Sequence, residues 1–211
     1  MLFDAIIYKC RLSAFYKKWK KKNQHNFCEV QTIFDINRVH IGNRTYGMIN
    51  PHLFDNIQSQ LYIGSFCSIA ENVHFVLGEH DYSIFSTYPY NAFIRRKEKE
   101  IPKTKGDIVV EDDVWIGFNS IILSGVTIHR GAVIGAGSVV SSDIPPYAVY
   151  AGGKIIKYRF SSDIIDKLLM VDYKKITDQY IINNYNLLNG NINEFIKSQA
   201  FIDVCSDVSI Q

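Results

Sequence analysis

The sequence predicts a mainly β fold in which short strands wind into a coil, because apolar residues recur at a constant step of six. Within 110–144 a large branched residue returns without a break, and a small or β-branched residue follows four places after each. The large set is Val110, Ile116, Ile122, Ile128, Ile134 and Val140. The small set is Val114, Ser120, Val126, Ala132, Ser138 and Ile144. This period fits neither a helix nor a single strand, but it fits a hexapeptide solenoid with one flat face and one turn per repeat.

The same period occurs earlier in the chain and extends the predicted coil toward the N-terminus. Its large positions are Ile57, Ile63, Ile69 and Phe75, with Leu61, Cys67 and Val73 at the small positions. The step from Phe75 to Val110 is not a multiple of six, so a segment without the repeat lies between the two blocks. A solenoid accepts such an insertion at a corner, because loop closure costs little with added length. We therefore expect a solenoid over 35–160 with a loop inserted at 76–107.

The N-terminal residues 1–34 form a basic amphipathic segment for which we expect a helix. Its first 25 residues carry one acid, Asp4, and many bases: Lys9, Arg11, Lys17, Lys18, Lys20, Lys21 and Lys22. Two alternatives are open. The helix docks on the solenoid or on a neighbouring subunit, or it attaches loosely to an anionic membrane surface, where each basic residue contributes about 1 kcal/mol.

The C-terminal residues 161–211 are predicted to form a helical tail. Pro145-Pro146 stops the repeat, since proline cannot donate to a strand ladder. Ser161 is a suitable helix N-cap, and apolar residues follow at helical spacing with a break at Asn189-Gly190.

Composition excludes several classes of protein. Hydrophobic residues make up 47% of the chain and charged residues 21%, as in ordinary globular proteins, and the net charge of +2 is too small for a dedicated nucleic-acid binder. No run of eighteen apolar residues suggests a membrane span. The cysteines show no zinc-ligand spacing and indicate a reducing, cytoplasmic location. They are Cys10, Cys28, Cys67 and Cys205.

His80 is the candidate catalytic residue, because it opens the inserted segment beside Gly78, among carboxylates and tyrosines. A neutral imidazole can accept a proton at neutral pH. On spacing alone, however, an ordinary surface histidine is the better explanation.

Several motifs together resemble the hexapeptide acyltransferases. They are Val114–Gly117, Ser124–Ile128, Gly131–Val140 and Asp143–Ala148. The resemblance implies a left-handed parallel β-helix. Gly78-Glu79-His80 followed by Ser86–Pro89 is similar to the branch that contains xenobiotic acetyltransferases and the sugar O-acetyltransferases of surface-glycan clusters.

The resemblance implies that His80 is a general base and that acetyl-CoA is the co-substrate, with no metal. The imidazole would take the proton of an acceptor hydroxyl, which attacks the thioester directly. The implied coenzyme A contacts are Trp115, Phe118, Asn119, Ala136, Ser141 and Lys154. The implied acceptor contacts are Glu79, Asp81, Tyr82 and Tyr88. Two departures affect the adenosine end of coenzyme A: Ser142 replaces a lysine of the family, and the turn 151–154 is short.

The resemblance also implies a homotrimer with the coenzyme cleft between subunits. We expect a cytoplasmic protein, and the basic N-terminal segment leaves a location at the inner face of the membrane open. The first interpretation is O-acetylation of a sugar hydroxyl of a surface polysaccharide (capsule, O-antigen or exopolysaccharide) or its precursor. The alternative is acetylation of a drug hydroxyl, as on chloramphenicol or a streptogramin. Two further classes stay open. One is a zinc-dependent carbonic anhydrase, although His74 and His80 do not have the histidine spacing of that family. The other is a catalytically silent scaffold.

Overall fold

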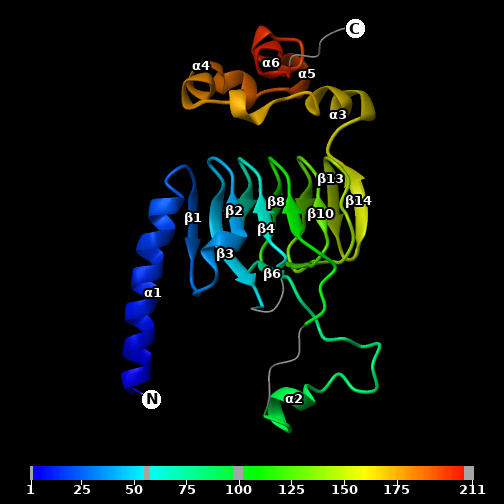
Figure 1. Cartoon of the computed structure of the whole chain (residues 1–211). Helices are drawn as coiled ribbons and strands as arrows, with labels where there is room; N and C mark the ends of the chain where they lie inside the picture. The colour runs from blue at the N-terminus through cyan, green and yellow to red at the C-terminus, as the bar shows by residue number, and fades with distance from the viewer. Residues whose placement is uncertain (1, 55–57, 97–101, 207–211) are drawn as a thin grey trace. The chain divides into compact units, whose positions relative to one another are not determined.

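The computed structural model describes residues 2–54, 58–96 and 102–206, which form two compact units (Figure 1). The first unit spans residues 1–157 and the second residues 158–211. The repeat position Ile57 and the charged residues 97–100 of the insertion lie outside the described residues.

The first unit is built from short strands. They are β1 (Phe27–Val30), β2 (Val39–Ile41), β3 (Tyr46–His52), β4 (Leu61–Ile63), β5 (Ser68–Ile69), β6 (His74–Val76), β7 (Ile108–Val110), β8 (Trp115–Ile116), β9 (Ile121–Leu123), β10 (Thr127–Ile128), β11 (Val133–Ile134), β12 (Val139–Val140), β13 (Ala148–Ala151) and β14 (Lys154–Tyr158). It also contains helices α1 (Leu2–Lys22) and α2 (Tyr90–Phe93) and the 3-10 turn η1 (Ile36–Arg38).

Each strand from β4 to β9 pairs in parallel with the strand three places further along the chain. β4, β7 and β10 form one ladder with β2, while β5, β8 and β11 form a second and β6, β9 and β12 a third. β3 pairs with β5 through its first residues and with β6 through its last, so it joins the second and third ladders into one ten-stranded sheet. The result is a mostly-sheet, parallel fold.

The buried core confirms the six-residue period. Every residue of the two sets in 110–144, and every described member of the earlier block, is at most 3% exposed. The ladders align equivalent positions, as Ile63, Val110 and Ile128 show. The two buried serines satisfy their hydroxyls locally: Ser120 Oγ donates to the carbonyl of Gly117 at 2.8 Å and Ser138 Oγ to that of Gly135 at 2.6 Å.

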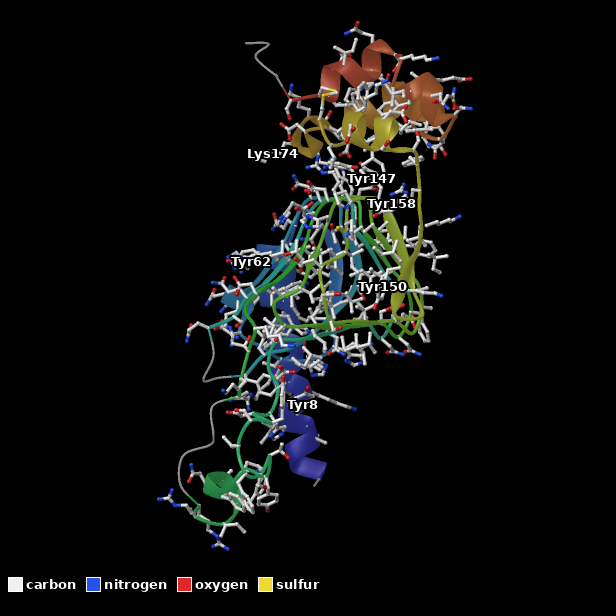
Figure 2. All side chains as sticks on the ribbon, turned by 90° about the vertical axis from the view of Figure 1, so that its right-hand side faces the viewer. Tyr8, Tyr62, Tyr147, Tyr150, Tyr158 and Lys174 are labelled. Carbon is white, nitrogen blue, oxygen red and sulfur yellow. The ribbon has the colours of Figure 1, made fainter. Side chains whose placement is uncertain are left out.

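The C-terminal half of α1 docks on the strand at the N-terminal end of the sheets. Trp19 is fully buried, and its Nε1 donates to the Cys28 carbonyl of β1 at 3.0 Å. The Phe34 ring packs edge-on against Phe15 and Trp19, with centroids 5.0 and 5.6 Å away. By contrast, residues 5–11 of α1 are exposed, and Tyr8 lies on the part of the helix that extends beyond the strands (Figure 2).

The second unit is helical, with α3 (Ser162–Leu168), η2 (Tyr173–Lys175), α4 (Asp178–Leu188), α5 (Ile192–Phe195) and α6 (Gln199–Val204). α3 begins after Ser161 and α4 ends at Leu188, as the capping residue and the break at Asn189-Gly190 predict. Phe195 and Phe201 pack edge-on at 5.6 Å in its small core. Within the described part of the chain, no helix is both long and apolar enough to cross a membrane.

Candidate active site

His80 lies where the chain leaves the sheets after β6 and enters the insertion, residues 77–107. Just before it, Glu79 forms an antiparallel bridge with Lys103, and each backbone N–H donates to the other residue's carbonyl at 2.8 Å. This bridge is the neck of the insertion. It fixes the backbone next to His80, while the imidazole itself is exposed.

Both carboxylates beside His80 are held at the neck. Asp81 accepts hydrogen bonds from the Ser83 N–H at 2.9 Å and the Ser83 hydroxyl at 2.6 Å, and its carboxylate lies 3.0 Å from Lys103 Nζ. These partners, Ser83 first, lower the pKa of Asp81 to about 2. Glu79 lies 3.8 Å from Lys105 Nζ. Each of these two carboxylates thus has a lysine partner at the base of the insertion.

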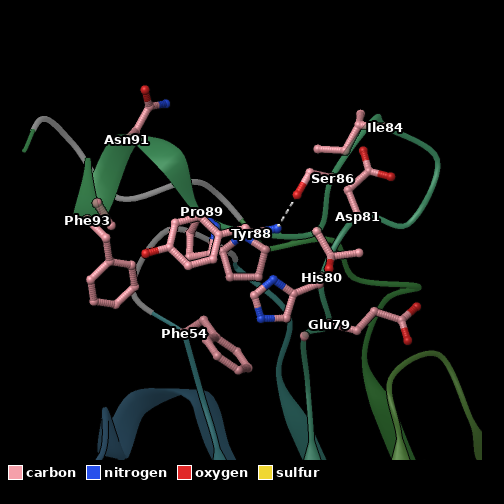
Figure 3. Close-up of a pocket in the computed structure, with 14 residues that line it drawn as sticks. Phe54, Glu79, His80, Asp81, Ile84, Ser86, Tyr88, Pro89, Asn91 and Phe93 are labelled. Carbon is pink, nitrogen blue, oxygen red and sulfur yellow. Dashed lines mark hydrogen bonds between the residues drawn. The ribbon is translucent and has the colours of Figure 1, made fainter. Parts of the chain in front are cut away.

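The insertion encloses a hollow of about 730 Å³ beside His80 (Figure 3). Its lining residues are Phe54, Gly78, Glu79, His80, Asp81, Ile84, Ser86, Thr87, Tyr88, Pro89, Asn91, Ala92, Phe93 and Pro102. The structure therefore brings Glu79, Asp81 and Tyr88 together with His80. The fourth acceptor candidate, Tyr82, is 78% exposed and does not line this His80 hollow.

Aromatic rings form one wall of the His80 hollow. The Tyr88 ring lies 5.9 Å from Phe93 of α2, and Figure 3 shows Phe54 across the hollow with the His80 imidazole between the aromatic side and Glu79. The sequence analysis did not identify Phe54 or Phe93. His52 pairs with Val76, an offset of 24 residues, whereas the regular coils have an offset of 18, as Trp115 and Val133 show, so the six-residue repeat gave no signal for Phe54. Phe93 carried no signal either, because it lies in the insertion outside the repeat.

Four of the six coenzyme candidates lie along one corner of the sheets. Trp115 points outward from β8 and is 55% exposed, and Phe118 in the next turn is 45% exposed. The carbonyl of Phe118 accepts from the N–H of Gly137, so the turn Phe118-Asn119 stacks on the turn that contains Ala136. Asn119 has a left-handed φ of 59°, which asparagine tolerates better than most residues.

The other two coenzyme candidates lie elsewhere. Ser141 follows β12 in a different turn, and Lys154 is exposed on β14. None of the six candidates lines the His80 hollow. The structure thus presents two separate surfaces, an aromatic hollow at His80 and an exposed corner at Trp115.

A histidine pair lies on the outer face of β3 and β6. His52 Nε2 is 2.7 Å from His74 Nδ1, which also accepts from the Asn50 side-chain amide at 3.0 Å. Burial, and then the neighbouring His74, lower the pKa of His52. Across the described residues, no three histidine, cysteine or acidic side chains gather closely enough to hold a metal ion.

Comparison with known proteins places these features in context. The family model "Bacterial transferase hexapeptide (six repeats)" matches residues 107–142. A probable macrolide acetyltransferase of Lysinibacillus sphaericus is 39% identical over 66% of this chain and 82% of its own length. A chloramphenicol acetyltransferase of Escherichia coli is 34% identical over 62% of this chain and 72% of its own. A crystal structure of a hexapeptide-repeat acetyltransferase from Vibrio cholerae aligns with a TM-score of 0.52 at 27% identity, over 71% of this chain and 82% of that one.

Proposed function

This chain belongs to the hexapeptide-repeat transferases and is an acyltransferase, and we propose that it moves the acetyl group of acetyl-CoA to a hydroxyl acceptor held beside His80. We propose further that its parallel strands form a left-handed β-helix, the fold of the family it resembles. The observation that carries the proposal is the position of His80. The backbone bridge between Glu79 and Lys103 holds this imidazole beside a hollow large enough for a small molecule or one sugar ring.

In this mechanism His80 is the general base. Its unprotonated ring nitrogen takes the proton of the acceptor hydroxyl as the oxygen forms a bond to the thioester carbonyl carbon. The tetrahedral intermediate then breaks its C–S bond, and the departing coenzyme thiolate takes the proton back from His80. General base catalysis of this kind typically supplies ~10²–10⁴-fold in rate, and alignment of two bound substrates supplies much of the rest.

The charged neck positions the base. The two-way backbone bridge and the Asp81–Lys103 pair fix the chain on either side of the imidazole. A reacting group must stay in place for proximity to lower the barrier. We assign Asp81 and Glu79 to this positioning role, because their carboxylates already have lysine partners.

The first candidate acceptor is a sugar hydroxyl of a surface polysaccharide or its precursor. The apolar face of a sugar ring packs well on aromatic side chains, and Phe54, Tyr88 and Phe93 supply such a wall. The second candidate is a drug hydroxyl, because the two relatives described above are named macrolide and chloramphenicol acetyltransferases. Both candidates use the same chemistry at His80.

We place the coenzyme along the exposed corner at Trp115, in a homotrimer whose cleft lies between subunits. The half-exposed rings of Trp115 and Phe118 support this placement, since large apolar side chains that adjoin on a surface mark ligand grooves or contacts with other proteins. Coenzyme A bound there in one subunit would reach the His80 hollow of a neighbouring one.

Acceptor profiling tests the proposal. The purified protein would be incubated with acetyl-CoA and, separately, with glycans, nucleotide sugars, a macrolide and chloramphenicol, while free thiol release and product mass are followed. An added mass of one acetyl group on a glycan supports the first candidate, and transfer to a drug alone supports the second. Absence of an added acetyl mass on all of these hydroxyl acceptors would overturn both candidates.

A further inference from the structure

Helix α1 has one face attached to the protein and an opposite face with no partner among the described residues. The attached face is defined by Trp19, which is fully buried, and by Phe15 and Tyr16, which pack against the core. Residues about 100° or more around the helix from Trp19 face away from the attached side. They include Ile6, Ile7, Cys10, Ala14, Lys17, Lys18 and Lys21, which are all exposed. We call these residues the free face of α1.

The free face is apolar toward the N-terminus and basic toward the C-terminus. Ile6 and Ile7 are 53% and 43% exposed. Lys17, Lys18 and Lys21 follow on the same face, with Lys9 and Arg11 at its sides. The one ion pair that the described part of α1 makes joins Lys20 to Glu29. The positive charge of the free face is therefore not neutralised within the described chain.

We infer that the free face of α1 docks on an anionic phospholipid surface. An interfacial helix buries apolar side chains at the boundary of the acyl chains and keeps basic side chains among the headgroups. Lysines can do this because their aliphatic stems reach from the apolar layer to the charged one. The free face combines exposed isoleucines with three lysines, and this is the chemistry that such a surface binds.

The anchoring of α1 makes this docking a property of the whole catalytic unit. Because Trp19 is hydrogen-bonded to β1, the helix cannot bind a surface without bringing the sheets with it. The N-terminal half of α1 and the insertion extend beyond the same edge of the strands in both views (Figures 1 and 2). Docking would therefore hold the His80 hollow close to the bilayer.

Vesicle sedimentation with the full chain tests the inference. The vesicles contain phosphatidylcholine alone or with roughly one third phosphatidylserine. We expect binding to the anionic vesicles only, weakening as salt rises, because the Debye length falls to about 8 Å at physiological ionic strength. Each basic side chain near such a surface raises partitioning roughly fivefold. The triple variant Lys17→Gln, Lys18→Gln and Lys21→Gln should therefore bind roughly 100-fold more weakly.

A matched control removes the same charge elsewhere. Lys167, Lys174 and Lys197 are exposed in the second unit, and changing all three to Gln should leave vesicle binding unchanged. The double variant Ile6→Ser and Ile7→Ser should lower partitioning roughly tenfold or more, since two apolar side chains no longer enter the interface. Circular dichroism confirms that each variant is folded.

Three results would overturn the inference. The first is absence of binding to anionic vesicles by the unmodified protein. The second is that both triple variants weaken vesicle binding equally, which would show that binding depends on net charge and not on the free face. The third is a change of oligomeric state in the Ile6→Ser, Ile7→Ser variant without any change in vesicle binding, which would make the free face a contact between copies of this chain.

Discussion

Two neighbouring isoleucines on β9 directly test which positions of the hexapeptide repeat face the core and which face outward. Ile122 is fully buried in the core, whereas Ile121 faces outward and is partly exposed. Ile122→Ala removes three carbon groups, or about 2.4 kcal/mol at about 0.8 kcal/mol each. The cavity left in a packed core adds to this, so we expect a loss of about 3–4 kcal/mol in the free energy of unfolding. Ile121→Ala leaves no closed cavity, and we expect a loss of about 1 kcal/mol.

Urea unfolding at one fixed protein concentration measures the difference. With an m value of about 2–3 kcal/mol/M, the midpoint for Ile122→Ala should fall by about 1–2 M, and that for Ile121→Ala by less than about 0.5 M. A shift of one residue in the strand register would exchange the two side chains between the faces. Equal midpoints, or a larger loss for Ile121→Ala, would therefore refute the assignment of the hexapeptide positions.

Three further predictions concern the insertion and the thiols. Phe93→Ala should raise the KM for the acceptor roughly tenfold without changing coenzyme affinity, because Phe93 lines the His80 hollow. Phe85→Ala is the control, since the Phe85 ring is fully exposed outside the hollow and its loss should leave KM unchanged. Steady-state kinetics compare the two variants. In the native protein at pH 8, iodoacetamide should label the exposed Cys10 and spare Cys67. The thiolate is the nucleophile, and burial raises the pKa of the Cys67 thiol to about 12. Mass spectrometry of the peptides measures the labelling, and labelling of both cysteines would contradict the prediction. Because the folded pKa of Asp81 is lowered to about 2, its carboxylate stabilises the neck fully above the unfolded value of about 3.9 and stops doing so as the pH falls through about 2. Hydrogen exchange of the insertion should thus be faster in Asp81→Asn than in the unmodified protein at pH 5, and the difference should vanish near pH 2; a difference that does not depend on pH would contradict it.

The repeating part of the fold was predictable because the repeat is a local pattern. Ile122 and Ser120 are both buried, although one is apolar and the other polar, since the six-residue step alone determines which positions point inward. Cys67 follows the same rule and is fully buried at a small position. The start of α3 after Ser161 was also predictable, although the Ser161 side chain makes no capping hydrogen bond in the structure.

Features that depend on distant contacts were not predictable. β3 pairs with two different strands, so the first coil begins without the clear hexapeptides of the later ones. Phe54 reaches the His80 hollow only through this pairing. The sequence indicated a helix at the N-terminus, but the burial of Trp19, which determines the free face of α1, depends on β1. The roles of His80 and of the coenzyme candidates stay predictions, since they concern substrates.

The role of His80 is tested most directly by comparing turnover and coenzyme binding in the unmodified protein and in His80→Ala. Free thiol release from acetyl-CoA with a competent acceptor gives turnover, and calorimetry gives the affinity for coenzyme A. We expect turnover to fall by about 10²–10⁴-fold while coenzyme affinity stays the same, because the imidazole acts on the acceptor proton. Undiminished turnover in His80→Ala would contradict the assignment of His80 as the general base.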